Sequence, residues 1–374
     1  LTPMRLTHLR VVQFRNHRHS DVTPAPGVTL FVGGNAQGKS SLLEAVQVAA
    51  TARSFRARHD AEMIMLGEAW ARVRAGVDRG GRAEEVDVAL RREEGEPPAR
   101  AAREIRVNGV ALRRGDLFGR LLCVLAAPDD TEIVTGSPLY RRRLLDLLLA
   151  QISPSYYFTA QRYGRVLLQR NRLLRIHGTG LEAWDEQIAL LGAALMVRRR
   201  DVLARLACAA RPIYAALTNG GEELTLTYAP SLQGDDEAAI TVWAREALVR
   251  KRREEAARGV TLIGPHRDDL GLRVNGRELR TFGSRGQQLT AMLAVRLAER
   301  RVLREETGEE PVLMLDDVLL TLDPSRQAYL MDGLRGTQVL LTMTTTATLA
   351  ALPEGAALYR VAGGTVEAER AHLT

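Results

Sequence analysis

The sequence predicts an α/β protein in which a mostly helical lobe is inserted into a nucleotide-binding unit. Two observations predict that unit: a glycine-rich loop between a short apolar strand and a helix, and a later apolar strand that ends in two aspartates. A third observation predicts the lobe, because residues 140–257 lie between these strands and show mostly helical patterns. The 374 residues suffice for two or three structural units with a sizeable core.

The chain opens with predicted strands at residues 6–14 and 28–32, and a helix is expected to begin at Ser40. Residues 70–113 are predicted to form antiparallel strands, since Asn108-Gly109 is a strong hairpin signal. A similar Asn-Gly turn recurs at residues 275–276.

The lobe is predicted to contain helices over residues 141–151 and from Pro154 to Arg175. A third helix is expected to end near Pro212, and a charged helix is expected to follow a short strand at 224–228 and to end near Arg258. No heptad pattern persists, which excludes a long coiled coil. Strand patterns return at 311–315 and 339–342.

The glycine-rich loop fits the pattern G-x-x-x-x-G-K-[ST], in which backbone N–H groups face phosphates and the following helix adds its dipole. Lys39 is one of two lysines among 52 Lys and Arg residues, and a compact ammonium fits a phosphate cradle where a guanidinium does not. An ordinary glycine turn is the alternative. The predicted phosphate-binding residues are Gly33, Gly34, Asn35, Ala36, Gln37, Gly38, Lys39, Ser40 and Ser41.

Asp316 and Asp317 follow the apolar run at residues 313–315. A carboxylate at the end of a buried strand is how phosphate-loop enzymes hold Mg²⁺. We therefore predict Asp316 and the Ser40 hydroxyl as magnesium ligands, and Asp317, together with Lys39, as a catalytic residue that orients or deprotonates the attacking water. A strand that simply runs into a turn is the alternative.

The formal charge of +7 and the pI of about 9.8 favour a polyanionic partner such as DNA. A basic enzyme without such a partner is the alternative. The sequence offers three basic clusters as candidate contacts to the duplex backbone, although a solvated helix face is the favoured interpretation of any single cluster. The clusters are residues 141–143, 198–200 and 250–253.

A third motif, Ser284-Arg285-Gly286-Gln287-Gln288, precedes a predicted helix at residues 289–300. The order of the three motifs resembles the ATPase heads of the ABC superfamily, of the type found in SMC proteins. Residues 321–323 stand where that family places its D-loop. The resemblance narrows to a family of bacterial recombination mediators. It is carried by Phe14-Arg15-Asn16, residues 33–45, 136–138 with 141–143 and Asp146, Gln169-Arg170-Asn171, residues 264–270, and the two later motifs.

This resemblance implies an ABC-type ATPase head of residues 1–125 and 260–374 with an inserted helical lobe of residues 126–259. It implies ATP and Mg²⁺ as cofactors, and a homodimer around two ATPs, in which Ser284, Gly286 and Gln287 contact the nucleotide held by the second subunit. It also implies binding to double-stranded, gapped or junction DNA, a RecR-type partner protein, recombinase loading, and slow ATP hydrolysis as a reset.

The chain departs from the wider ABC pattern at three places. Asp317 replaces the usual catalytic glutamate, and residues 344–346 are threonines where many heads have a histidine. Residues 127–130 occupy the region of the glutamine loop but contain no glutamine. The absence of that histidine argues against a transporter subunit, and the absence of heptads argues against a long tether. A nucleotide-dependent scaffold that does not hydrolyse ATP stays open.

The chain has no run of ~18 apolar residues and no signal-peptide pattern. Its two cysteines, Cys123 and Cys208, fit no metal or redox spacing. We therefore expect a cytoplasmic protein.

Overall fold

The computed structural model describes residues 4–93, 101–319, 322–334, 336–345 and 355–369. The chain divides into two compact units, Leu1–Asp130 with Glu299–Thr374, and Thr131–Ala298. Residues 260–298, which the sequence analysis assigned to the head, pack with the second unit because β10 pairs with β9. A functional head of residues 1–125 and 260–374 stays a prediction.

The first unit contains two six-stranded sheets. One is antiparallel throughout, with the order β2-β1-β4-β5-β6-β7, and it confirms the strands expected at residues 70–113. Its strands are β1 (Met4–Phe14), β2 (His17–Val22), β4 (Trp70–Arg79), β5 (Arg82–Arg92), β6 (Ala101–Val107) and β7 (Val110–Ala111).

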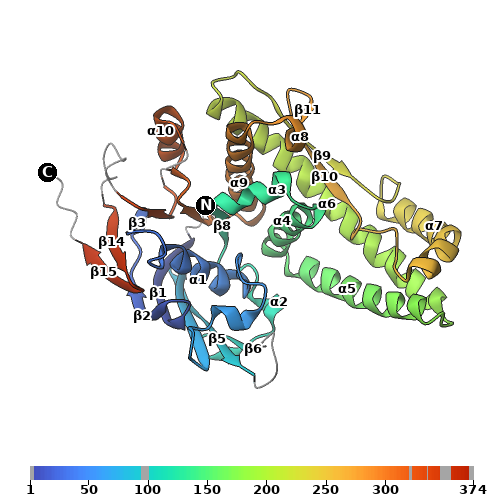
Figure 1. The fold of residues 1–374 in the computed structure, drawn as a ribbon, viewed down its shortest axis with the longest axis horizontal. Coiled ribbons are helices and arrows are strands. Elements are labelled where there is room, and N and C mark those ends of the chain that lie inside the picture. Colours follow the sequence, from blue (N-terminus) through green and yellow to red (C-terminus); the bar gives the residue numbers. More distant parts are fainter. Residues whose placement is uncertain (1–3, 94–100, 320–321, 335, 346–354, 370–374) are drawn as a thin grey trace. The chain divides into compact units, whose positions relative to one another are not determined.

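The other sheet has the order β15-β14-β3-β13-β12-β8, and only its edge strand β15 is antiparallel. Figure 1 shows β14 and β15 beside β3. The apolar runs at 28–32, 311–315 and 339–342 all form buried parallel strands, as predicted. Its strands are β3 (Val28–Val32), β8 (Cys123–Ala126), β12 (Val312–Asp316), β13 (Val339–Met343), β14 (Ala357–Ala362) and β15 (Thr365–Glu369).

Helix α1 (Lys39–Thr51) contacts strands of both sheets, and every one of its residues except Ser40 is buried. The helix is apolar on most sides, as a helix between two packed sheets must be. This packing fixes the position of the glycine-rich loop that precedes it. The remaining short elements of the unit are η1 (Asp60–Met63), α2 (Arg114–Leu117), η2 (Pro128–Asp130) and α10 (Pro324–Gly333).

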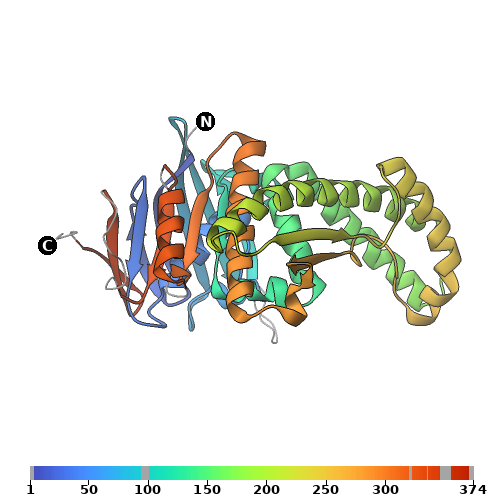
Figure 2. The ribbon, with the colours of Figure 1, turned by 90° about the horizontal axis from the view of Figure 1, so that it is seen from above.

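The second unit packs helices against the three-stranded antiparallel sheet β11-β10-β9. Helix α5 contacts α4, α6 and α7, and Figures 1 and 2 show α5 and the long α6 running side by side. The elements are α3 (Thr131–Thr135), α4 (Pro138–Ile152), α5 (Pro154–Arg175), α6 (Leu181–Leu217), β9 (Leu224–Ala229), α7 (Glu237–Arg258), β10 (Asp269–Val274), β11 (Arg277–Glu278) and α8 (Leu279–Phe282). Helix α9 (Arg285–Thr307) begins in this unit and ends in the first.

The predicted end of the third lobe helix is wrong, because α6 continues through Pro212 to Leu217. Proline removes one backbone hydrogen bond and disfavours a helix interior. Here Tyr214 and Leu217 are buried beyond it, and their burial offsets that cost. Both Asn-Gly turns form hairpins as predicted, one between β6 and β7 and one between β10 and β11. None of the described helices is long and apolar enough to cross a membrane.

Candidate nucleotide-binding site

The glycine-rich loop connects β3 to α1 and depends on two of its glycines for its shape. Gly38, the N-cap of α1, has φ 115°, a conformation that L side chains rarely adopt. At Gly33 an added Cβ would lie 2.1 Å from the Val361 carbonyl oxygen, so only glycine fits against β14 there. These two glycines therefore set the path of the loop.

Lys39 and Ser40 occupy the first turn of α1. The Lys39 side chain is 4% exposed, and its Nζ donates to the carbonyl oxygens of Gly33 and Gly34 at 2.8 and 2.9 Å. Ser40 Oγ donates to Asp316 Oδ1 at 2.6 Å. The structure therefore joins the phosphate loop to the aspartate at the end of β12.

Thr342 on β13 holds both aspartates, because β13 lies between β3 and β12 in the sheet. Its hydroxyl donates to Asp316 Oδ1 at 2.7 Å and accepts from the Asp317 backbone N–H at 2.9 Å. Sequence analysis missed Thr342. Its place at the carboxyl end of a parallel strand was the available signal, since such ends meet at one edge of the sheet.

Asp317 is the unusual group of the site. Its φ of 50° is rare for a residue with a side chain, and its Oδ1 is buried without a hydrogen-bond partner among the described residues. Burial raises the pKa of this carboxyl, the nearby Lys39 ammonium opposes that effect, and Asp316 adds to it. A strained, poorly solvated and more basic carboxylate is suited to accept a proton from water.

The Mg²⁺ expected from the sequence fits the residues found here. The Ser40 hydroxyl and the Asp316 carboxylate are hard oxygen ligands, and they already lie within hydrogen-bond distance of each other. Asp316 Oδ2 lies 3.3 Å from Arg56 Nη2, so this guanidinium balances part of the negative charge of the carboxylate.

Arg15 and Glu44 join the start of the chain to α1. Arg15 forms two hydrogen bonds with the fully buried Glu44 carboxylate, at 2.9 and 2.6 Å. The Ser54 hydroxyl also donates to Glu44, and this contact anchors the segment that carries Arg56. The Phe14-Arg15-Asn16 motif thus supports the segment that follows α1.

Two hairpin turns hold the phosphate loop from outside. In the β1–β2 turn, Asn16 Nδ2 donates to the Gln37 carbonyl oxygen at 2.9 Å, and His17 Nε2 lies 2.9 Å from the Gly38 carbonyl oxygen. In the β14–β15 turn, the Gly364 N–H donates to the Gln37 carbonyl oxygen at 3.0 Å. We call these contacts the loop bracket. No sequence motif indicated the part played by His17.

A pocket of about 670 Å³ adjoins the loop bracket through Asn16. Its lining is mixed, with two arginines, a histidine, a glutamate and apolar side chains. The lining residues are Arg15, Asn16, His59, Ala61, Glu62, Ile64, Leu66 and Arg92.

The third motif forms the N-terminus of α9. Ser284 Oγ accepts from the Gln287 backbone N–H at 3.2 Å, and Gln287 Oε1 accepts from the Ser284 N–H at 2.8 Å. This reciprocal pair is a capping box, so the motif has a structural role of its own. Ser284 and Gly286 are exposed, which leaves them accessible to another molecule. Of the predicted D-loop and the threonine segment, Thr321 and Thr346 lie outside the described residues.

Curated proteins of known name resemble this chain over almost its whole length. "DNA replication and repair protein RecF" of Heliobacterium modesticaldum is 40% identical over 372 residues, which cover 96% of this chain and 98% of that protein. The chain belongs to the RecF family. A solved structure, the recombination mediator protein RecF with ATP in the RecFOR pathway, is 32% identical with a TM-score of 0.89, and the match covers 99% of this chain and 100% of that one.

Wider comparisons place the RecF family chain in the ABC-type ATPase fold. An SMC head bound to the C-terminal winged-helix domain of ScpA matches at a TM-score of 0.53 with 15% identity, and the match covers 97% of this chain and 96% of that one. The AAA domain family matches residues 8–115, the part that carries the phosphate loop. The fold class predicted from the sequence is confirmed.

The family-diagnostic residues of the second unit form a buried network in this RecF family chain. Residues 264–269 receive contacts from three helices, since Arg141 pairs with Asp269, Tyr163 with His266, and Arg199 with the Pro265 carbonyl oxygen. Burial lowers the pKa of His266 to about 4, so its ring is neutral at pH 7. These motif residues hold their own unit together.

The network removes two arginines from the candidate DNA contacts. Arg141 and Arg199 are 4% and 5% exposed and bind Asp269 and Asp146. Neither side chain can reach DNA. Arg252 is half-buried and pairs with Glu182 and Asp185. Each cluster was predicted as a whole because sequence shows the charges and not the carboxylates that fold against them.

Proposed function

We propose that this RecF family chain is an ATP-dependent DNA-binding clamp for recombinational repair and replication restart. The observation that carries the proposal is the loop from Gly33 to Ser40, in which the Ser40 hydroxyl lies 2.6 Å from Asp316 Oδ1. This is the arrangement that phosphate-loop ATPases use. The similarity to a solved structure of RecF with ATP supports it.

The site residues have distinct roles in the proposed reaction. The loop N–H groups bind the phosphates, and the Lys39 ammonium turns from the Gly33 and Gly34 carbonyls to the β and γ phosphates. Ser40 and Asp316 hold Mg²⁺, which neutralises phosphate charge. The loop bracket keeps the Gln37–Gly38 backbone in place, and the adjoining pocket receives the nucleoside.

Asp317 orients the attacking water and accepts its proton in the proposed hydrolysis. The raised pKa of its carboxyl favours proton acceptance. Its side chain is one methylene shorter than the glutamate of the wider superfamily, so the water is held less precisely. Slow hydrolysis, suited to a switch that resets, follows from that difference.

Dimerisation closes the site in the proposed mechanism. Ser284, Gly286 and Gln287 at the exposed start of α9 contact the ATP held by the second subunit. The helix N-terminus presents backbone N–H groups there, which favour the γ-phosphate. ATP therefore acts as the contact between two copies of the chain.

The ATP-bound dimer binds duplex, gapped or junction DNA and promotes recombinase loading with a RecR-type partner. The net charge of +7 supports a polyanionic partner. The solved relative named for the RecFOR pathway supports the assignment to that pathway.

Sedimentation velocity tests the proposal. We would compare the wild type with and without ATP, and use Asp317→Asn to trap the ATP-bound state. We expect a dimer only with ATP, and a larger dimer fraction when duplex DNA is added. A monomer under all these conditions would contradict the clamp and leave only the fold in common with the family.

A further inference from the structure

Helix α5 carries a line of exposed arginines and no acidic residue. Arg162, Arg165, Arg172 and Arg175 are all exposed. Their spacing of three, seven and three residues places them on one side of the helix. We call these four residues the arginine stripe.

The arginine stripe has no carboxylate partners among the described residues, which distinguishes it from most of the cations on α7. Among the described residues, no carboxylate forms an ion pair with any of the four, and the one side-chain bond is from Arg162 to the neutral Gln187 at 3.4 Å. On α7, by contrast, four of the five exposed cations pair with glutamates, and Arg253 is the exception among the described residues. The α7-linked pairs are Arg245–Glu186, Arg250–Glu246, Lys251–Glu254 and Arg258–Glu254.

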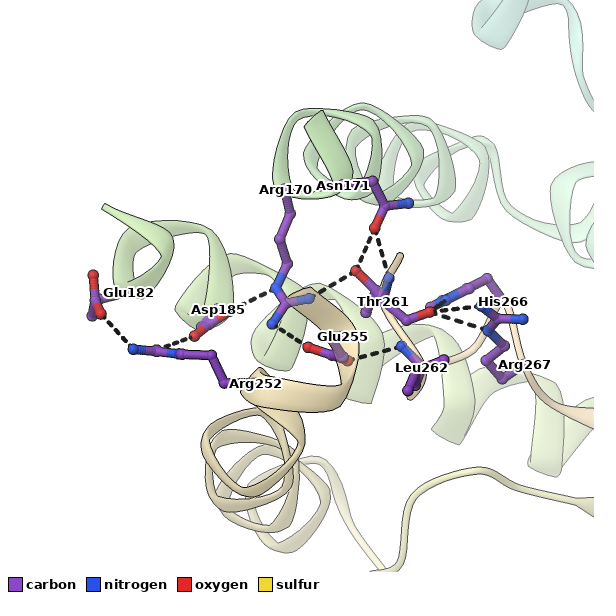
Figure 3. Close-up of polar contacts among 10 residues, drawn as sticks. All are labelled: Arg170, Asn171, Glu182, Asp185, Arg252, Glu255, Thr261, Leu262, His266 and Arg267. Atoms are coloured by element: carbon purple, nitrogen blue, oxygen red, sulfur yellow. Dashed lines mark hydrogen bonds and ion pairs between the residues drawn. The ribbon is translucent and has the colours of Figure 1, made fainter. Parts of the chain in front are cut away.

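The fifth arginine of α5 points the opposite way. Arg170 is fully buried and binds Asp185, Glu255 and Thr261, as Figure 3 shows. It lies on the face that packs against α6 and α7. The helix therefore sorts its arginines: the buried one has two carboxylates, and the exposed four have none.

Helix stabilisation explains only part of the arginine stripe. Arg172 and Arg175 lie in the last turn, where cations interact favourably with the helix dipole. Arg162 and Arg165 lie in the middle of the helix and gain nothing from it. Solubility does not require the stripe either, because paired charges on α7 already give a hydrated surface.

We propose that the arginine stripe of α5 binds the phosphate backbone of duplex DNA; this inference rests on the DNA binding proposed above. The stripe from Arg162 to Arg175 spans about 20 Å at 1.5 Å per residue. Measured along the duplex axis, that length corresponds to roughly six phosphates of one strand, at a rise of about 3.4 Å each. Unpaired guanidiniums along such a line match a row of phosphates without reading sequence.

The rest of α5 favours a duplex over a single strand. Its tyrosines Tyr156, Tyr157 and Tyr163 are buried, so they offer no platform on which bases could stack. Leu168 is exposed on the same side, but a single exposed leucine is ordinary on a protein surface. Charge is thus the dominant property of this face.

The test replaces the arginine stripe with glutamine, a good helix former, in R162Q/R165Q/R172Q/R175Q. The matched control is R245Q/R250Q/K251Q/R258Q, which removes the same number of positive charges from the paired cations of α7. Binding of a fluorescent 30-base-pair duplex is measured with ATP at several salt concentrations, and circular dichroism confirms that both variants fold. ATP binding is measured in parallel.

We expect the stripe variant to bind duplex at least tenfold more weakly than wild type while binding ATP normally. The slope of log affinity against log salt should fall by about 3.6, because each phosphate that is no longer neutralised lowers it by roughly 0.9. The α7 control should keep most of the affinity and the slope.

Three outcomes would overturn the inference, and they differ in what else they affect. A wild type that binds no DNA with ATP would overturn the proposed DNA binding and the stripe together. A stripe variant that keeps the wild-type slope of log affinity against log salt would overturn only the proposal that the arginine stripe contacts DNA. The stripe would then be better explained as a contact for an acidic protein surface. An equal loss in the α7 control would show a net-charge effect and not a contact.

Discussion

The half-buried carboxylate of Asp317 makes the nucleotide site testable at the residue scale. Replacing it by Asn keeps the size and removes the base. We expect ATP binding to persist and turnover to fall about 10²–10⁴-fold, the range of general-base catalysis. Equal, near-zero turnover of wild type and variant would instead favour a nucleotide-dependent scaffold that does not hydrolyse ATP.

The pH dependence of turnover follows from the raised pKa of Asp317. The base must be ionised, so turnover should fall as pH drops through a pKa above the ordinary aspartate value of about 3.9. The same carboxyl favours the folded state only when protonated. Asp317→Asn should therefore raise the thermal midpoint of the nucleotide-free protein at pH 7, and the gain should vanish below about pH 3.9.

A substitution of Lys39 tests ATP binding and its link to dimerisation. Lys39→Ala removes the buried ammonium that we propose binds the phosphates, so we expect loss of ATP binding and, with it, of the ATP-dependent dimer. A fluorescent nucleotide titration and sedimentation measure the two effects. A dimer of this variant in ATP would contradict a contact made through the nucleotide.

The loop bracket is formed by two hairpins, so it belongs to the scale of elements. A substitution of His17 tests whether the bracket supports ATP binding. The Gly38 carbonyl can only accept, so His17 Nε2 carries the proton, and burial lowers the pKa of the ring. His17→Leu should weaken ATP binding about five- to tenfold, the equivalent of one hydrogen bond of about 1 kcal/mol. His17→Gln can still donate to the carbonyl and should restore most of the affinity in calorimetric titrations.

The two faces of α5 allow a matched stability test. Arg170→Met leaves the buried Glu255 without its cation and Asp185 with Arg252 alone, and we expect a loss of about 3–5 kcal/mol in the free energy of unfolding. Arg165→Met on the exposed face should change it by less than about 0.5 kcal/mol. Urea unfolding, followed by the fluorescence of Trp184 and Trp243 in the second unit, measures both free energies. Equal losses of unfolding free energy in the two variants would contradict the assignment of Arg170 to a buried ion-pair network and of Arg165 to an exposed face.

At the scale of the whole molecule, Ser284 tests the contact between subunits. Ser284→Arg places a bulky cation at the exposed start of α9, so we expect intact ATP binding and no dimer. The change also removes the cap, which costs about 1 kcal/mol. Ser284→Ala removes the same cap without bulk and should dimerise. Unimpaired dimerisation of Ser284→Arg would show that the motif does not act between subunits.

Features that depend on neighbouring residues along the chain were predictable from the amino-acid sequence. The glycine-rich loop, the strand that ends at Asp316 and the Asn-Gly hairpins were predicted because their conformations are set by a few consecutive residues. The burial of α1 also follows from its own apolar pattern. These features sufficed to predict the fold class and the phosphate site.

Tertiary packing, by contrast, determines which polar groups meet across long stretches of sequence. Thr342 contacts Asp316 because β13 and β12 are neighbours in the sheet. His17 contacts Gly38 because the β1–β2 hairpin places it beside the glycine-rich loop. The arginines of the second unit look alike in sequence, yet Arg199 is buried and Arg165 is exposed. The physical reason is that a charge tolerates burial only beside a carboxylate, and which carboxylate arrives there is fixed by packing.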